Sequence, residues 1–195
     1  MYRKFGKRLV DLVLSGIALI PLSVVYLVLA IAIKVDDPGP VFFRQDRGTI
    51  NGKIFRIHKF RSMIVDAEKD NKPHPATERD PRITPVGRIL RASRLDELPQ
   101  LIDILVGNMS LVGPRPERVE HTEKYTEMIP EFEYRLKVRG GLTGYAQLYG
   151  KYNTSPVDKL HLDLLYIENY SFLLDIKLII MTFKILFVKE TKDLL

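Results

Sequence analysis

Two adjacent carboxylates near the middle of the chain, Asp96 and Glu97, are accompanied in the sequence by cationic side chains. Arg91 lies just before them, Arg115 follows them, and Lys59 lies further towards the N-terminus. This combination suits a magnesium-assisted phosphoryl transfer, because the metal ion screens a carboxylate from its anionic electrophile while the cations stabilise the oxygens of the transferred group. The alternative is a plain solvated surface, to which most exposed arginines belong.

A helix is predicted directly after the two carboxylates. Apolar residues recur with helical spacing from Leu95 to Leu105, and Gly107 follows as a stop. Pro99 fits only within the first turn of a helix, which places Asp96 at or beside the N-cap. Free backbone N–H groups and the positive end of the helix dipole would attract a phosphate there. From spacing alone, ordinary capping by Asp96 is the simpler interpretation.

Arg115 stands between two prolines, within residues 113–117. The two rings stiffen the backbone and leave the guanidinium few orientations, which suits the binding of a phosphate. Lys59 and Arg61 add positive charge directly after a predicted β-hairpin. Three glycines within residues 139–144 predict a tight turn, which could let the backbone approach a ligand. The segment has neither the preceding strand nor the lysine that are typical of a phosphate-binding loop.

The elements that position these residues follow from turn formers and β-prone runs. Residues 36–40 are rich in Asp, Pro and Gly and end the preceding apolar segment. Residues 41–43 and 54–57 are β-prone and flank Asn51-Gly52, which predicts a hairpin. Residues 72–85 carry several prolines among polar side chains and predict a loop that covers a site.

Composition limits the possible chemistry. The chain has 195 residues, 30 Lys and Arg against 24 Asp and Glu, a formal net charge of +6 and no Cys. This size allows one domain plus an appendage. The lack of Cys excludes disulfides, Cys-ligated zinc, iron–sulfur clusters and thiolate nucleophiles, so any nucleophile is an oxygen or a nitrogen. The mild positive charge suits nucleic acid, anionic lipid and phosphorylated substrates alike.

The N-terminal segment is apolar enough to enter a membrane. Residues 12–33 carry no charged side chain, and a helix with a rise of ~1.5 Å per residue would be long enough there to cross a hydrocarbon core of about 30 Å. Pro21 near the middle predicts a kink, and basic residues on both flanks favour a cytoplasmic position for both ends. We therefore predict a re-entrant helix in residues 1–36, which dips into the bilayer and returns, followed by a cytoplasmic-face domain in residues 37–195.

Two other interpretations of the N-terminal segment remain. It could be a straight membrane span, or a cleaved signal peptide with Ala30-Ile31-Ala32 as the cleavage site. The apolar stretch is longer than the usual core of a signal peptide, which places that interpretation last. Under all three interpretations the segment contacts a bilayer.

Residues 172–188 form a second apolar segment near the C-terminus. Asp175, Lys177 and Lys184 interrupt it, so it is too charged to span a membrane. These charges do not fall on one clean helical face. Burial against the domain and a position at the membrane interface are therefore both open for this segment.

Four motifs, together with the proline-broken apolar helix in front of them, resemble the bacterial sugar transferases known as monotopic phosphoglycosyl transferases. The similarity runs from about Lys7 to the C-terminal helix. The motifs are Lys59-Phe60-Arg61-Ser62-Met63, Arg94-Leu95-Asp96-Glu97-Leu98-Pro99-Gln100-Leu101, Ser110-Leu111-Val112-Gly113-Pro114-Arg115-Pro116-Glu117 and Gly141-Leu142-Thr143-Gly144-Tyr145-Ala146-Gln147. Each motif could arise by chance, but four in this order are specific.

The resemblance implies an α+β fold that is predominantly helical. It consists of an N-terminal re-entrant membrane helix, a small β-hairpin and a helical catalytic domain with interfacial amphipathic helices. Such a protein lies on the cytoplasmic face of the bacterial inner membrane. It transfers a sugar-1-phosphate from a UDP-sugar to polyprenyl (undecaprenyl) phosphate and releases UMP, the first membrane step of exopolysaccharide, capsule or glycoconjugate assembly. The implied partners are these two substrates and membrane lipids, with no nucleic acid, and a homodimer is allowed.

The resemblance also implies a role for each candidate residue. Asp96 is the nucleophile that forms a covalent phosphosugar–aspartyl intermediate, and it helps to hold Mg²⁺. Glu97 is the second member of the catalytic pair. Lys59, Arg91 and Arg115 fall on positions that contact substrate phosphates. The residues agree with this chemistry, since a metal ion and cations lower the charge that a weak carboxylate nucleophile must approach.

Two rival functions belong to different classes. One is a membrane-tethered binding protein whose basic surface grips anionic lipid or nucleic acid. The other is a metal-dependent phosphohydrolase of lipid phosphates. Only a transferase releases nucleoside monophosphate in step with the formation of a lipid-linked sugar, so the products separate these possibilities.

Overall fold

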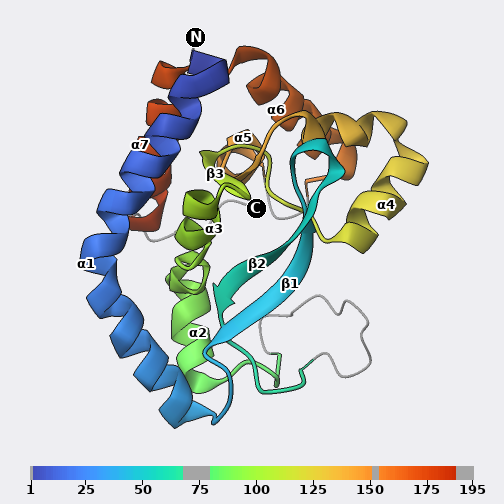
Figure 1. Ribbon diagram of the computed structural model, residues 1–195. Helices are drawn as coiled ribbons and strands as arrows, with labels where there is room; N and C mark the ends of the chain where they lie inside the picture. The colour runs from blue at the N-terminus through green and yellow to red at the C-terminus, as the bar shows by residue number, and fades with distance from the viewer. Residues whose placement is uncertain (1, 68–79, 151–153, 188–195) are drawn as a thin grey trace.

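The structure of this chain, a computed structural model, describes residues 2–67, 80–150 and 154–187 and is mostly helical (Figure 1). The helices are α1 (Lys7–Asp36), α2 (Pro85–Ala92), α3 (Gln100–Val106), α4 (Val119–Met128), α5 (Tyr145–Tyr149), α6 (Pro156–Asn169) and α7 (Phe172–Phe187). Shorter turns are η1 (Tyr2–Gly6), η2 (Ile50–Gly52), η3 (Leu95–Glu97) and η4 (Pro130–Lys137). The strands are β1 (Phe42–Gly48), β2 (Ile54–Phe60), β3 (Met109–Val112) and β4 (Gly140–Thr143). A helix-rich α+β fold is therefore confirmed.

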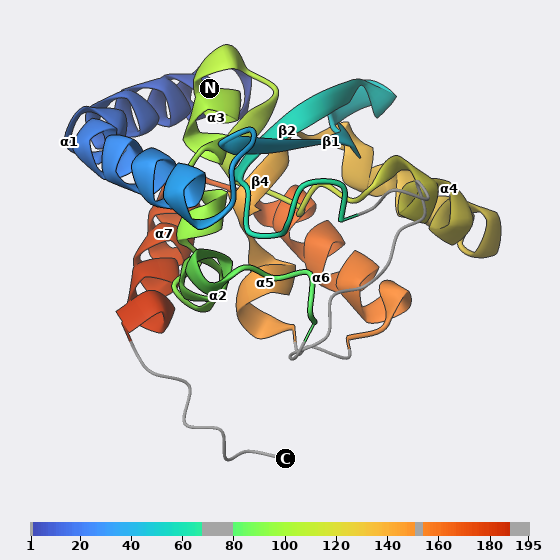
Figure 2. The same cartoon turned by 90° about the horizontal axis from the view of Figure 1, so that it is seen from below.

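The N-terminal apolar segment forms one long helix that includes Pro21. With η1 it is long and apolar enough to cross a membrane, with a mean hydropathy of 2.6, and only 6% of its apolar window is buried. Figure 2 shows the two halves of α1 running in different directions, and a bend agrees with an internal proline. Ser23 Oγ donates to the Ile20 carbonyl oxygen at 2.6 Å, next to the proline.

Both ends of α1 are attached to the rest of the protein. At its start, Lys7 Nζ lies 2.7 Å from Asp175 Oδ2 of α7, and Arg8 Nη2 donates to the Leu105 carbonyl at 2.7 Å. At its end, the carboxylate of Asp36 accepts from the backbone N–H of Val86 in α2 at 3.1 Å. The helix therefore lies along the side of the domain instead of projecting away from it (Figure 1).

The predicted hairpin is confirmed. β1 and β2 pair in antiparallel register, with Phe42 opposite Phe60 and Gly48 opposite Ile54. Asn51 and Gly52 lie in the connection with φ of 58° and 71°, a left-handed conformation that Asn and Gly adopt most readily. Of the predicted loop at 72–85, residues 72–79 lie outside the described residues.

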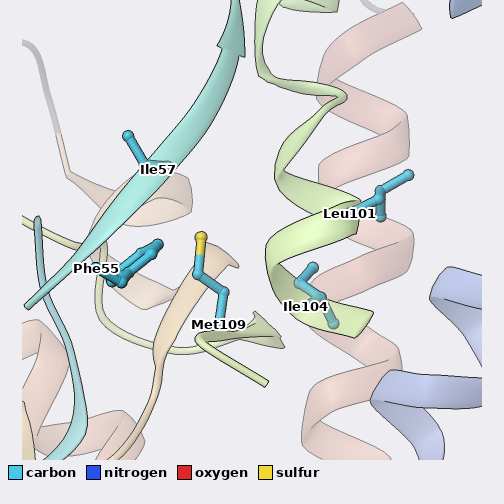
Figure 3. Packing of buried hydrophobic residues seen from close by; sticks show 5 residues of the cluster. All are labelled: Phe55, Ile57, Leu101, Ile104 and Met109. Atoms are coloured by element: carbon cyan, nitrogen blue, oxygen red, sulfur yellow. The ribbon is translucent and has the colours of Figure 1, made fainter. Parts of the chain in front are cut away.

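The hairpin packs on α3 through one face of β2. Phe55 and Ile57 are two positions apart on that strand and therefore point to the same side. They form a buried cluster with Leu101 and Ile104 of α3 and with Met109 of β3 (Figure 3). This cluster fixes β2 against α3, so the end of β2 and the start of α3 have a defined separation.

A second buried cluster joins α1 to the segment that carries the two carboxylates. Ile33 of α1 packs with Phe60 of β2 and Leu90 of α2, and Leu95 and Leu98 pack against this cluster. The second half of α1 also bonds directly to this region, because the Tyr26 hydroxyl donates to the Leu98 carbonyl at 2.6 Å. The apolar helix and the carboxylate segment are therefore one packed unit.

The glycines at 140–144 do not form the predicted tight turn. Gly140 and Gly141 lie in β4, which pairs in parallel with β3. Glycine is required for another reason, because a Cβ at Gly141 would lie 2.1 Å from the backbone nitrogen of Gly113. The absence of side chains thus lets the two backbones approach, and the residues after β4 face a cavity described below.

The C-terminal apolar helix α7 has one buried side and one exposed side. Asp175 is buried, accepts from the Tyr166 hydroxyl at 2.8 Å and pairs with Lys7, and Leu178 is fully buried. On the other side Leu173 is 78% exposed and Phe183 is exposed. The buried side agrees with the first interpretation of this segment, burial against the domain. The exposed apolar side is not covered by the described part of the chain, so a position at the membrane interface stays open as well.

Candidate active site

The two carboxylates do not lie at the N-cap of the following helix, which corrects the sequence prediction. Asp96 and Glu97 belong to the 3-10 turn η3, and the N-cap of α3 is Pro99. The N–H groups of Leu101 and Ile102 donate to the carbonyls of the third residue before them. These turn bonds engage the N–H groups of Leu101 and Ile102, and no side chain of the described residues caps α3, so the charged groups described below come from side chains and not from a capped helix end.

Arg94 sets the direction of η3. It has φ of 55°, a left-handed conformation that is uncommon for a residue with a side chain, and it separates α2 from η3. η3 then packs between α2 and β2. This abrupt change of direction brings Glu97 to the end of β2, where Lys59 lies.

Glu97 is held by two cations from distant parts of the chain. Lys59 Nζ lies 2.7 Å from Glu97 Oε1, and Arg115 binds both carboxylate oxygens, with Nη1 3.1 Å from Oε2 and Nη2 bonded to Oε1. Burial alone would raise the pKa of Glu97, but the charges of Arg115 and Lys59 lower that pKa far below its usual value. Glu97 is therefore a fixed anion that positions the two cations.

Asp96 differs from its neighbour. Its side chain is half-buried and forms no hydrogen bond or ion pair within the described part of the chain. Burial raises the pKa of Asp96, the charge of Glu97 adds to this, and Lys59, Arg91 and Arg115 oppose it. The Asp96 carboxylate thus has free lone pairs beside a group of cations, which is what a nucleophile towards phosphorus requires.

The other predicted cations are placed differently. Arg91 is exposed in the last turn of α2, and although its charge lowers the pKa of Asp96, no ion pair joins the two among the described residues. Arg61 is buried and pairs with Asp37 at 3.0 Å. Asp37, which follows the last residue of α1, neutralises this charge. The prediction that Arg61 adds positive charge to the site was therefore wrong.

The backbone around Arg115 is held by two arginines that sequence reasoning missed, the buried Arg135 and the partly buried Arg47. Arg135 Nη2 donates to the Arg115 carbonyl at 3.0 Å, while its Nε donates to the fully buried Asp163 at 2.6 Å. Arg47 Nη1 donates to the Pro116 carbonyl at 3.1 Å. No sequence signal marks these two arginines, because their partners lie on distant elements. Together with the prolines they fix the loop that presents the Arg115 guanidinium.

Glu117 completes this support and gives a pH-dependent prediction. It lies 2.9 Å from Lys159 and 4.0 Å from Arg135. Burial would raise its pKa, but Lys159 and Arg135 lower it overall. A folded-state pKa below the unfolded value stabilises the fold above that unfolded value, near 4.3, and the contribution is lost as the pH falls through the folded-state pKa.

We therefore expect Glu117→Gln to lower the free energy of unfolding by about 1 to 2 kcal/mol at pH 7. The difference between the two proteins should begin to shrink as the pH falls below the unfolded value near 4.3, and it should vanish below the lowered folded-state pKa, where wild-type Glu117 is also neutral. Urea unfolding in detergent at a series of pH values measures this. A difference that stays constant with pH would contradict the assigned charge interaction.

A cavity of about 120 Å³ lies next to the carboxylate pair. Its lining combines the charged groups of the site with residues of β4, α5 and α7. The lining residues are Arg94, Glu97, Leu98, Arg115, Leu142, Thr143, Gln147, Leu148, Thr182 and Ile185. One part of the cavity is therefore charged and the rest is mainly apolar, with a few polar side chains.

The residues present are compatible with Mg²⁺. In the described ranges no three or more His, Cys, Asp or Glu side chains converge as a complete metal cage. Mg²⁺ is, however, commonly bound through one or two carboxylates, with substrate phosphates and waters as the remaining ligands. Asp96 offers an unpaired carboxylate of this kind. Glu97 is less suited, since Lys59 and Arg115 already bind its oxygens.

Comparison with known proteins identifies the family of this chain. The family model described as bacterial sugar transferase matches residues 2–189. The chain belongs to this family. Within the matched residues, the structure places the acidic pair, residues 96–97, beside two cations and a cavity.

The chain is similar to several curated proteins. It is 45% identical to a UDP-glucose:undecaprenyl-phosphate glucose-1-phosphate transferase of Klebsiella pneumoniae, over 90% of this chain and 39% of that protein. It is 41% identical to a protein of the same name from Caulobacter vibrioides, over 90% of this chain and 67% of that protein. It is 39% identical to an exopolysaccharide production protein of Rhizobium leguminosarum, over 89% of this chain and 90% of that protein. The chain spans about two fifths of the length of the first of these.

Proposed function

We propose that this chain transfers a sugar-1-phosphate from a UDP-sugar to polyprenyl phosphate, with release of UMP. The observation that carries the proposal is the contrast between Asp96 and Glu97, in which one carboxylate is fixed by two cations and the other is free beside them. The names of the similar transferases, which state UDP-glucose and undecaprenyl phosphate, support the substrate classes.

The proposed reaction has two displacements at one phosphorus atom. An oxygen of Asp96 attacks the phosphorus attached to the sugar, and the bond to the bridging oxygen breaks, so UMP leaves with the electron pair. An oxygen of polyprenyl phosphate then attacks the same phosphorus and displaces the Asp96 carboxylate, which gives polyprenyl-diphosphate-sugar and regenerates the protein. Two displacements explain why one free carboxylate is needed and why it must be accessible in turn to both substrates.

The cations stabilise the negative charge that these displacements create. Arg115 holds Glu97 through Nη1 and Nη2, which leaves its remaining N–H groups to bind phosphate oxygens, and Lys59 adds a compact charge beside it. Glu97 holds both in place before substrate arrives, and Arg91 lies at the exposed edge of the site. Mg²⁺, when bound at Asp96 and the substrate phosphates, would supply further neutralisation of the phosphate oxygens.

The described surface supports membrane attachment of this site. Helices α1, α2 and α7 lie on the same side of the molecule, opposite α4, in both Figures 1 and 2. Each of the three helices exposes large apolar side chains, including Ile20 of α1, Ile89 of α2 and Leu173 of α7. An apolar surface of this kind is favourable against lipid, and a site next to α1 can receive the phosphate of a polyprenyl lipid at headgroup depth.

The attachment of both ends of α1 supports a re-entrant helix rather than a span. A straight helix of 30 residues would be ~45 Å long, enough to place its ends on opposite sides of a bilayer. Instead Lys7 and Asp36 both bind the same domain. In our proposal this domain and both ends of α1 lie on the cytoplasmic face of the inner membrane, with α2 and α7 as interfacial helices.

The topology can be tested with single cysteines because the chain contains none. We expect Lys4→Cys, Lys34→Cys and the hairpin variant Lys53→Cys to react with a membrane-impermeant maleimide only when the cytoplasmic face is exposed. All three positions are exposed in the structure. Inverted vesicles and intact spheroplasts provide the two orientations. Labelling of the Lys4 variant in spheroplasts, with no labelling of the Lys53 variant there, would instead indicate a spanning helix.

The activity is tested by incubation of the protein with a panel of UDP-sugars, Mg²⁺ and polyprenyl phosphate. We expect UMP and lipid-linked sugar in equal amounts with at least one donor. A lipid-phosphate phosphohydrolase would release inorganic phosphate without nucleotide, and a binding protein would release neither. Absence of UMP with every donor would count against the proposal.

A further inference from the structure

Gln147 of α5 contributes a buried side-chain amide to the cavity beside the carboxylate pair. Its Oε1 and Nε2 atoms are both buried, and neither has a hydrogen-bond partner within the described part of the chain. Buried polar atoms are nearly always paired, since an unpaired donor or acceptor loses its bonds to water without replacement. A buried amide with both atoms unpaired in a cavity wall therefore indicates a ligand that supplies an acceptor and a donor.

The position of Gln147 relates it to the reacting groups. The same cavity is lined by Glu97 and Arg115, which hold the phosphate-binding end, and by Leu142 and Leu148, which are apolar. A ligand that fills this cavity therefore has an anionic part near Arg115. Its other part is flat or narrow and mostly apolar, with a polar edge that reaches Gln147.

The two hydroxyl groups that line the same cavity already form hydrogen bonds within the protein. Thr182 donates its only hydroxyl proton to the Leu178 carbonyl at 2.8 Å. Thr143 Oγ1 lies 2.7 Å from Thr182 Oγ1, so Thr143 must be the donor in that contact. No hydroxyl proton in this pair is left for a ligand, and Gln147 is the side chain that offers both a donor and an acceptor.

We propose that the amide of Gln147 binds the pyrimidine base of the nucleotide sugar by two parallel hydrogen bonds. Uracil carries an N–H next to a carbonyl, so its N3–H can donate to Oε1 while O4 accepts from Nε2. The leucines of the wall suit the faces of the planar ring, and the phosphates extend towards Arg115. This inference rests on the proposed function and adds the part of the donor that the cavity recognises.

The other parts of the two substrates match the wall less well. The isoprenoid chain of the lipid has no polar atoms, so it would leave both atoms of the Gln147 amide unpaired. A sugar has donors and acceptors but also hydroxyl groups on every side, which would face the apolar side chains of Leu142, Leu148 and Ile185. A heterocycle with one polar edge and two apolar faces satisfies both features.

The test compares UMP with ribose 5-phosphate, which has the phosphate and the ribose but no base. Binding to the whole 195-residue chain in detergent is measured by calorimetry, which requires no turnover. We expect the wild-type protein to bind UMP more tightly than ribose 5-phosphate, and Gln147→Leu to lose roughly tenfold or more of that preference. Gln147→Glu is nearly isosteric and should also lose it, because one carboxylate oxygen would face O4 of the base.

Gln100→Leu is the matched control. Gln100 is also a buried glutamine with an unpaired Nε2, but it is not among the residues that line the cavity. The control should keep the wild-type ratio of UMP to ribose 5-phosphate affinity. In turnover assays, Gln147→Leu should raise the KM for the UDP-sugar by a similar factor and leave the KM for polyprenyl phosphate unchanged.

Three results would overturn the assignment. The first is a wild-type ratio of affinities in both Gln147 variants. The second is a raised KM for polyprenyl phosphate instead of the UDP-sugar, which would assign the cavity to the lipid. The third is a changed preference among UDP-sugars with unchanged UMP binding, which would assign it to the sugar. Failure of the proposed function is distinguishable, since then the wild-type protein releases no UMP with any donor.

Discussion

Asp96→Asn is expected to lower the rate of UMP release by about 10⁴-fold or more, with the fold retained. The amide oxygen of asparagine is a far weaker nucleophile than a carboxylate, and removal of a covalent nucleophile has effects of this size in other enzymes. The substitution keeps the shape of the side chain and breaks no hydrogen bond, because the Asp96 carboxylate has none among the described residues. The rate is measured with UDP-sugar, Mg²⁺ and polyprenyl phosphate under saturating conditions.

Asp46→Asn is the matched control for this variant. Asp46 lies on the hairpin, and its side chain is more than half exposed where it pairs with the exposed Arg56, so the same chemical change there should leave turnover unchanged. The covalent step is tested directly with donor but no lipid acceptor, followed by mass analysis of peptides. An added sugar phosphate should map to Asp96 in the wild type and in the control. A protein that turns over without this adduct would refute the two-step reaction.

The parts of the fold that sequence predicts well are those with a local cause. The hairpin follows from Asn51-Gly52, whose left-handed conformation is intrinsic to those residue types. The bend of α1 agrees with an internal Pro21 and needs no distant partner. The start of α3 was predicted wrongly because Pro99 is compatible with both an N-cap and a first helical turn, and the 3-10 bonds around it decide between them.

The parts that sequence could not predict have distant causes. The three glycines after Arg139 have a composition typical of a turn, but they allow two strands to approach, and the partner, Gly113, is far away in the chain. Likewise Arg61 and Arg135 look like other basic residues until the structure shows their partners, Asp37 and Asp163. Parallel pairing and buried ion pairs depend on contacts that no local pattern encodes.

Only part of the candidate site could be predicted from local sequence patterns. The types of Asp96, Glu97, Lys59 and Arg115 suggested phosphoryl transfer, but residue types and spacing do not distinguish the two carboxylates. The structure separates them, because only Glu97 is bound by both cations. This difference arises because the end of β2 and the loop that carries Arg115 both lie beside Glu97. It agrees with the assignment of Asp96 as nucleophile, which the sequence reached through resemblance alone.

Arg115→Met is expected to lower kcat/KM for the UDP-sugar by about 10² to 10³-fold, the usual effect of removing one preorganised group that stabilises transition-state charge. Methionine keeps an unbranched side chain of similar length, so the packing of the loop changes little. Arg115→Lys should recover only part of this loss, since lysine supplies a charge but cannot bind two oxygens at once, as Arg115 binds those of Glu97. Steady-state kinetics with varied donor concentration measure both values.

The support of the Arg115 loop predicts that these losses are chemical rather than structural. Arg135 and Arg47 hold the carbonyls of Arg115 and Pro116, and neither bond involves the Arg115 side chain. Arg115→Met leaves Glu97 with Lys59 as its cation, so the free energy of unfolding should fall, while the loop itself stays in place. Arg56→Lys on the exposed hairpin should change neither stability nor rate. If lysine restored the full rate, the planar fork would be unnecessary, and a single positive charge at this position would explain the role of Arg115.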